Sequence, residues 1–110
     1  MKALVIKQPW IDYIIDGKKT WEIRGSNTKI RGKIFLIQSG SGLIVGSCEL
    51  IDSIPLNIDL YQKGIQHHCI SNINNLPYKN TYAWVITNPK RFKEPIKYKH
   101  PKGAIIWVNV

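Results

Sequence analysis

The stretch "PWIDYIIDGKKTWEIRG", residues 9–25, predicts a short helix that leads directly into a short strand. Pro9 is well tolerated in the first turn of a helix. Apolar side chains then recur four residues apart, which places them on one helix face. This stripe consists of Trp10, Ile11, Ile14 and Ile15. Gly17 is suited to ending the helix, and Lys18 and Lys19 are favoured beside its negative C-terminal end.

Residues 20–24 are expected to form a strand, in which alternate side chains point to opposite faces. Trp21 and Ile23 share one face. The other face carries Thr20, Glu22 and Arg24, with Lys19 at the turn into the strand. A polar face of this kind is either the solvated surface of a sheet or the floor of a binding site.

The rest of the chain predicts further strands around this unit. They are expected at residues 3–7, 33–40, 42–54, 81–89 and 103–110, the last as a buried strand. Gly46 indicates a bulge or a close approach of another backbone. Asn88 and Pro89 predict a turn that closes a strand, and Pro95 indicates an edge strand in the residues that follow. Residues 55–80 predict a short helix and then an Asn-rich loop.

Five to seven strands with two short helices predict an α+β fold, a small mixed β-barrel that carries the helices. The length of 110 residues fits one domain, residues 1–110. No stretch approaches the roughly 18 apolar residues of a membrane span, and no secretory segment follows Met1, so a cytoplasmic protein is expected. Cys48 and Cys69 are therefore expected to be reduced thiols.

The charge balance favours polyanionic partners. The chain has 16 Lys and Arg against 7 Asp and Glu, a net charge of +9. Contacts between cations and phosphates release counterions, and the aromatic side chains among the cations suit the stacking of bases better than a lipid surface. The chain is also rich in Ile, Lys and Asn, which gives part of the lysine excess a purely compositional explanation. RNA or a modified nucleoside is the expected partner; the oligomeric state stays open.

Lys19, Glu22 and Arg24 are the candidate catalytic residues. The planar guanidinium of Arg24 suits a phosphate, a carboxylate or a base edge. A carboxylate such as Glu22 accepts from an exocyclic amine, as one does from cytosine N4. Lys19, at a helix end near other cations, is expected to have a lowered pKa and to act as a base or nucleophile. The alternative is a structural Glu–Arg pair on a solvated sheet.

Two further groups of residues are candidate binding residues. Gln8 and Trp10 flank the proline at the helix start, where an amide and an indole offer a seat for a nucleoside. The alternative for Trp10 is a place in the core. Lys97 and Lys99 lie on one face of an extended segment, where they would follow an RNA backbone. The alternative for these two is protection of an edge strand against aggregation.

No metal or other cofactor is expected. His67, His68 and Cys69 are adjacent, whereas zinc sites need about four ligands, usually in spaced pairs. The chain contains neither a phosphate-binding P-loop nor the glycine pattern of dinucleotide sites.

The chain resembles the ASCH domain family in the order and spacing of several short motifs. These are Lys7-Gln8-Pro9-Trp10, Gly17-Lys18-Lys19-Thr20, Glu22-Ile23-Arg24 and Arg31-Gly32, followed by "GLIVGSCELID" (42–52) and "TNPKRFKEPI" (87–96). The resemblance implies a PUA-like barrel with a ligand cleft between the barrel and the first helix. It also implies a binding module for RNA or a modified nucleoside, with Gln8, Trp10 and Thr20 among the binding residues.

The resemblance also implies an alternative function as a small hydrolase. Family members that remove the acetyl group of N4-acetylcytidine use a Lys and a Thr of this segment with a distant Glu. The Lys corresponds to Lys19, but Glu22 occupies the position of the Thr, and Thr20 lies at a different step. No residue matches the distant Glu; Glu49 is the only glutamate on a neighbouring strong strand. An amidohydrolase or ribonuclease would use the same cleft, so whether the protein is an enzyme stays open.

Overall fold

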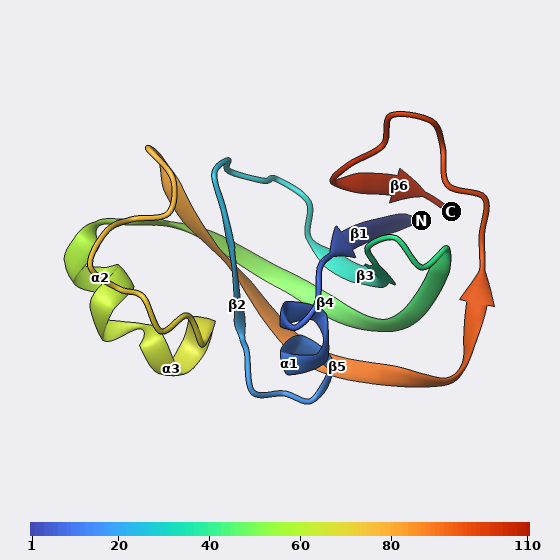
Figure 1. Cartoon of the computed structure of the whole chain (residues 1–110), viewed down its shortest axis with the longest axis horizontal. Coiled ribbons are helices and arrows are strands. Elements are labelled where there is room, and N and C mark those ends of the chain that lie inside the picture. The colour runs from blue at the N-terminus through green and yellow to red at the C-terminus, as the bar shows by residue number, and fades with distance from the viewer.

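A curled six-stranded sheet surrounds one short helix in the computed structural model, which describes all residues, 1–110 (Figure 1). The elements are β1 (Lys2–Ile6), α1 (Trp10–Ile15), β2 (Trp21–Arg24), β3 (Gly32–Gln38), β4 (Leu43–Leu56), α2 (Ile58–Lys63), α3 (Ile65–His68), β5 (Thr81–Lys97) and β6 (Trp107–Asn109). The strand order is β2-β5-β4-β3-β1-β6, and only β1 and β3 pair in parallel. The predicted α+β class is confirmed. None of the helices has the length and apolar character that crossing a bilayer would require.

The main core lies between α1 and the sheet. Ile11, Ile14 and Ile15 are buried, and Trp10 is partly buried against the same cluster. The predicted apolar stripe is therefore confirmed. The strands contribute Leu4, Ile6, Ile34, Leu36, Val45, Cys48, Leu50, Trp84 and Ile86. Gly17 has a φ of 81°, a left-handed conformation that favours glycine and ends the helix where the sequence predicts.

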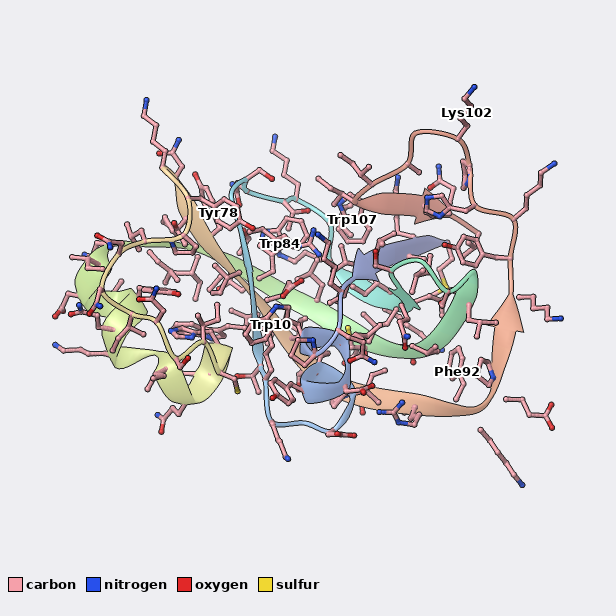
Figure 2. All side chains as sticks on the ribbon, in the orientation of Figure 1. Trp10, Tyr78, Trp84, Phe92, Lys102 and Trp107 are labelled. Atoms are coloured by element: carbon pink, nitrogen blue, oxygen red, sulfur yellow. The ribbon has the colours of Figure 1, made fainter.

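The sheet curls without closing into a fully hydrogen-bonded barrel, because β2 and β6 stay at its two ends. Trp84 on β5 nevertheless stacks on Trp107 of β6, with ring centroids 5.7 Å apart (Figure 2). Arg24 at the end of β2 donates from Nη2 to the Val5 carbonyl of β1 at 2.9 Å. We call this unpaired junction between β2 and β1 the seam. The predicted barrel is thus an open one, bridged at the seam by side chains.

The turn predicted at Asn88 and Pro89 is wrong, since β5 runs through both residues to Lys97. The pairing with β4 shifts register there, so that Asn88 and Pro89 lie opposite a single residue, with Asn88 at a φ of 53°. Such a bulge accommodates a proline without ending the strand. Beyond the bulge β5 pairs only with β4, which confirms the predicted edge strand.

The segment after β4 contains two helices where the sequence predicts one. The Asn57 side chain accepts a hydrogen bond from the Leu60 amide at 2.8 Å and caps α2. Gly64 ends α2 and also precedes α3. A Cβ at Gly64 would overlap the Trp21 ring, so the chain packs closely against β2 at this point. The loop predicted after the helix is confirmed by residues 69–80, which form no helix or strand.

The last strand is shorter than predicted and lies at a sheet edge. β6 covers only Trp107–Asn109 and pairs with β1 alone. A turn removes the preceding residues from the sheet, since the Ala104 amide donates to the Pro101 carbonyl and Gly103 has a φ of 84°. Val108 is buried, but Ile105 is 79% exposed. The prediction of a buried strand over 103–110 is therefore wrong, since only Trp107–Asn109 form a strand and only Val108 in it is buried.

Candidate functional site

A cavity of about 370 Å³ lies at the seam, and we call it the seam cavity. It is lined by Val5, Ile6, Lys7, Trp10, Lys19, Glu22, Ile23, Arg24, Ser39, Ile70, Pro77, Tyr78 and Ile105. Pockets that bind small molecules measure roughly 300–1,000 Å³ and combine apolar walls with a few polar groups. The lining holds three cations and one carboxylate, so the cavity favours an anionic or electron-rich ligand.

Glu22 and Arg24 form a tight ion pair on the cavity floor. Arg24 donates from Nη2 and Nε to the same carboxylate oxygen, Oε2, at 2.8 and 3.2 Å. The other oxygen, Oε1, accepts no hydrogen bond and lies 4.0 Å from Nζ of Lys19. Every fully buried side-chain nitrogen or oxygen in the structure has a hydrogen-bond partner. Because Oε1 has none, it is not fully buried and is open to the cavity. The floor therefore presents a free acceptor on an otherwise buried carboxylate.

Lys19 is the most unusual residue of the site, because its side chain is only 1% exposed. Its Nζ donates to the His68 carbonyl at 2.6 Å and lies 4.9 Å from the Trp10 ring centroid. Burial lowers the pKa of the Lys19 ammonium, and the charge of Glu22 partly opposes this effect. A buried ammonium needs such partners to offset the loss of water.

The end of α1 directs Lys19 into the cavity. The amides of Lys18 and Lys19 both donate to the Tyr13 carbonyl, at 2.9 and 3.0 Å, which wraps the chain tightly around the helix end. The next amide, that of Thr20, donates to the His67 carbonyl at 2.8 Å. The segment between α1 and β2 is thus fixed on one side by α1 and on the other by α3.

Two aromatic side chains line the seam cavity. Trp10 comes from α1 and Tyr78 from the loop before β5 (Figure 2). Trp10 packs against the core and also lines the cavity, so it occupies both of the environments considered from the sequence. The Tyr78 ring lies over Gly25, where a Cβ would come within 2.9 Å of Tyr78 Cδ1. The absence of a side chain at Gly25 allows Tyr78 to lie at the cavity.

Gln8 and Thr20 lie outside the seam cavity. Gln8 Nε2 donates to Asp12 at 3.0 Å and to Gln38 at 3.2 Å, so it connects the start of α1 to the end of β3. Thr20 Oγ1 forms a hydrogen bond of 3.2 Å with Nδ1 of His67. The structure therefore gives both side chains local partners.

Lys97 and Lys99 are exposed at and after the end of β5 and do not line the seam cavity. Of the eight predicted site residues, the cavity brings together four. These are Trp10, Lys19, Glu22 and Arg24.

Sequence reasoning misses several lining residues, Ser39 and Ile70 among them. Ser39 reaches the seam because β3 pairs in parallel with β1, and its amide donates to the Ile6 carbonyl at 2.9 Å. Ile70 lies there because the left-handed Cys69, with a φ of 61°, turns the chain back after α3. No local pattern carries these long-range arrangements. The sequence did indicate Lys7, because it is the first residue of the Lys7-Gln8-Pro9-Trp10 motif.

The His67, His68 and Cys69 side chains are each engaged separately. His67 stacks on Trp21 with centroids 4.7 Å apart, and Cys69 Sγ donates to the Lys18 carbonyl at 3.3 Å. No group of three or more potential metal ligands gathers in the structure. Both Cys48 and Cys69 are free.

His68, whose carbonyl accepts from Lys19, is fully buried and is held in its neutral form. The Ile70 amide donates to Nδ1 at 2.9 Å, so the proton lies on Nε2, which donates to the Tyr61 carbonyl at 2.7 Å. If Nδ1 were also protonated, its N–H would face the N–H of Ile70, and the two donors would repel each other. Burial lowers the pKa of His68 below its usual 6.5.

We therefore expect the free energy of unfolding to decrease as pH falls below about 6.5, the pKa of an unfolded histidine. The sign follows because the unfolded chain takes up this proton before the folded chain does. Urea unfolding between pH 5 and 8 measures the slope. His68→Asn should flatten it, and Gln66→Asn, an exposed neutral change in the same helix, should leave it unchanged. An unchanged slope in His68→Asn would contradict the assignment.

Comparison with known proteins places this geometry in a known fold. The family model described as ASCH domain matches residues 4–96. The crystal structure of ASCH from Zymomonas mobilis is similar, with a TM-score of 0.73 and 14% identity over 87% of this chain and 72% of that chain. The S128A mutant protein from the same organism gives a TM-score of 0.77 and 12% identity over 99% of this chain and 87% of that chain.

None of the curated proteins matches the chain. The identities to the solved structures are low, so these structures show a shared fold alone. The family match extends over 93 residues, from β1 to the end of the long β4–β5 pair, and includes all four predicted residues of the seam cavity. The chain therefore belongs to the ASCH domain family.

Proposed function

We propose that this ASCH domain binds the base of a nucleoside, free or within RNA, in the seam cavity. Glu22 accepts a hydrogen bond from an exocyclic amine of the base, and Trp10 and Tyr78 contact its faces. The ligand class is therefore an amine-bearing base such as cytosine.

The observation that carries this proposal is the free oxygen of Glu22. A carboxylate that is only 8% exposed, with both Arg24 hydrogen bonds on Oε2, leaves Oε1 as an unused acceptor inside a cavity. Burial makes such an acceptor selective, because a ligand without a matching donor leaves it unpaired. A carboxylate accepts from cytosine N4 and does not accept from uracil O4.

The walls and the charge of the cavity support the same ligand. Aromatic side chains stack on bases, at about 1–3 kcal/mol for each base. Lys7 at the cavity rim forms no ion pair within the protein and is exposed, so it is free to meet a phosphate. The excess of nine positive charges over the whole chain favours the approach of an anionic ligand.

Isothermal titration calorimetry with cytidine and uridine tests the proposal. Cytidine should bind more tightly than uridine, and Glu22→Gln should weaken cytidine binding by roughly tenfold to a hundredfold, as expected for one hydrogen bond to a charged group. The same variant should bind uridine no more weakly than the native chain, because a glutamine amide donates to O4. The control Glu49→Gln makes the same change in charge outside the seam cavity.

Equal affinity for both nucleosides, or equal losses in the two variants, would refute the role of Glu22. Thermal unfolding of each variant separates a loss of binding from a loss of folding.

A second candidate function, hydrolysis of an N-acylated nucleoside, rests on Lys19. Because its pKa is lowered, the Lys19 ammonium loses its proton at a lower pH than an exposed lysine does. Its Nζ lies 4.0 Å from Glu22 Oε1. A neutral amine is able to take a proton from the attacking water. The amide C–N bond then breaks, the amine of the base takes a proton, and the acyl group leaves as a carboxylate.

Incubation with N4-acetylcytidine, followed by chromatography, tests this candidate. Cytidine and acetate should appear at a rate that rises with pH up to the pKa of Lys19, which lies below its usual 10.5. Lys19→Met keeps the length of the side chain and should slow the reaction by about a hundredfold or more, as for loss of a general base. Tight binding without any product would leave binding alone as the function.

A further inference from the structure

A second cavity of about 610 Å³ continues from the seam cavity, and we call it the second cavity. The two share Val5, Lys7, Ser39 and Ile105. The other lining residues of the second cavity are Gly40, Gly42, Tyr98, His100 and Ala104. The two cavities therefore adjoin, and a ligand that extends from Glu22 past Lys7 and Ser39 follows a path into the second cavity, between the β3–β4 turn and the segment that follows β5.

The shared section of this path offers two exposed polar side chains. Lys7 is exposed and forms no ion pair, and Ser39 is exposed, with its amide donating to the Ile6 carbonyl. An ammonium and a hydroxyl that line the same section of a cavity suit a phosphate. They lie between the two cavities, where a phosphodiester would lie if each cavity held one nucleoside.

The far wall of the second cavity is aromatic and fixed in position. The Tyr98 hydroxyl forms a hydrogen bond of 2.7 Å with Nδ1 of His100, and Nε2 of His100 lies 2.6 Å from the Ala104 carbonyl. Their rings meet edge to face, with centroids 5.7 Å apart. Rings held in this way offer a surface for a base without a large loss of side-chain entropy on binding.

The charge around the second cavity favours a nucleic acid strand. None of its nine lining residues is acidic. Lys97, Lys99 and Lys102 are exposed in and around the segment that contributes Tyr98 and His100, and Figure 2 shows Lys102 pointing outward from the loop before β6. The two lysines predicted as backbone contacts line neither cavity, but both are sequence neighbours of Tyr98, which lines the second cavity.

We propose that the second cavity binds the nucleotide next to the base in the seam cavity, so that the ligand is single-stranded RNA rather than a free nucleoside. Lys7 and Ser39 bind the connecting phosphate, and Tyr98 and His100 contact the flanking base. This inference rests on the proposed function, because the base bound at Glu22 determines which nucleotide of the strand lies in the second cavity. The path leaves the seam cavity in one direction, so the flanking nucleotide lies on one defined side of the recognised base.

Calorimetry with cytidine, CpU and UpC tests the inference. Uridine has no exocyclic amine, so the cytosine of each dinucleotide should occupy the seam cavity. One of the two dinucleotides should bind about tenfold more tightly than cytidine, and the other should gain little. Lys7→Ala should remove most of that gain and lower the salt dependence of dinucleotide binding by about one phosphate contact.

His100→Ala, which changes the second cavity alone, should also reduce the gain and should leave cytidine binding unchanged. Lys2→Ala, an exposed lysine at the start of the same strand as Val5, is the matched control for charge.

Three results would overturn the inference, and they differ in their consequence for the proposed function. Equal gains for CpU and UpC would indicate general electrostatic attraction with no second site. No gain for either, with cytidine still bound, would leave the proposed function intact and remove the flanking site. No binding of cytidine or of either dinucleotide would remove both.

Discussion

Arg24→Ala is expected to destabilise the fold by about 3–5 kcal/mol, the usual cost of removing one partner from a buried ion pair. The sequence alone suggests a small effect, since it describes Arg24 as part of a polar strand face. In the structure Arg24 is only 18% exposed and makes two hydrogen bonds to Glu22 and one to the Val5 carbonyl of β1. Its loss leaves a buried carboxylate unpaired and removes the hydrogen bond across the seam. Urea unfolding at pH 7 measures the change.

Two further variants identify the source of this loss. Adding Glu22→Gln to Arg24→Ala should restore part of the stability, because the unpaired charge is then gone. Arg31→Ala removes an exposed arginine whose 3.8 Å pair with Asp52 is solvated, and it should cost less than about 1 kcal/mol. A native unfolding midpoint in Arg24→Ala would contradict the structural role of the ion pair at the seam.

Gly46→Ala is expected to destabilise the fold by about 3 kcal/mol, at the upper end of the cost of overpacking. An added Cβ would overlap the Lys90 carbonyl oxygen of β5 and would also approach the Ile15 side chain of α1. A backbone atom in a paired strand has no alternative rotamer, so β4 and β5 must move apart. Thermal unfolding measures the loss.

Gly40→Ala provides the contrast to Gly46→Ala. Gly40 has a φ of 80° but nothing within 4 Å of an added Cβ, so its substitution should cost only about 1 kcal/mol of backbone strain. Equal losses at Gly40 and Gly46 would show that the tight contact between β4 and β5 does not constrain the fold.

The local parts of the fold and of the site were predictable from the sequence. The alternation in β2 places Ile23 in a buried cluster and pairs Glu22 with Arg24 on the other face, because side-chain direction in a strand has a period of two. The stripe of α1 and its end at Gly17 are equally local.

The burial of Lys19 was not predictable, since it depends on the His68 carbonyl, 49 residues away. Pairing between distant strands likewise overrides the local turn preference of Asn88 and Pro89. The position of Tyr78 depends on its packing over Gly25, a contact that no pattern in either segment records.

A crystal structure of the protein with CpU or UpC, whichever binds more tightly, shows whether the base meets Glu22. We expect the cytosine in the seam cavity, with its exocyclic nitrogen within about 2.7–3.2 Å of Glu22 Oε1, the distance of a direct hydrogen bond. A dinucleotide bound elsewhere, or a cytosine with its amine directed away from Glu22, would contradict the account.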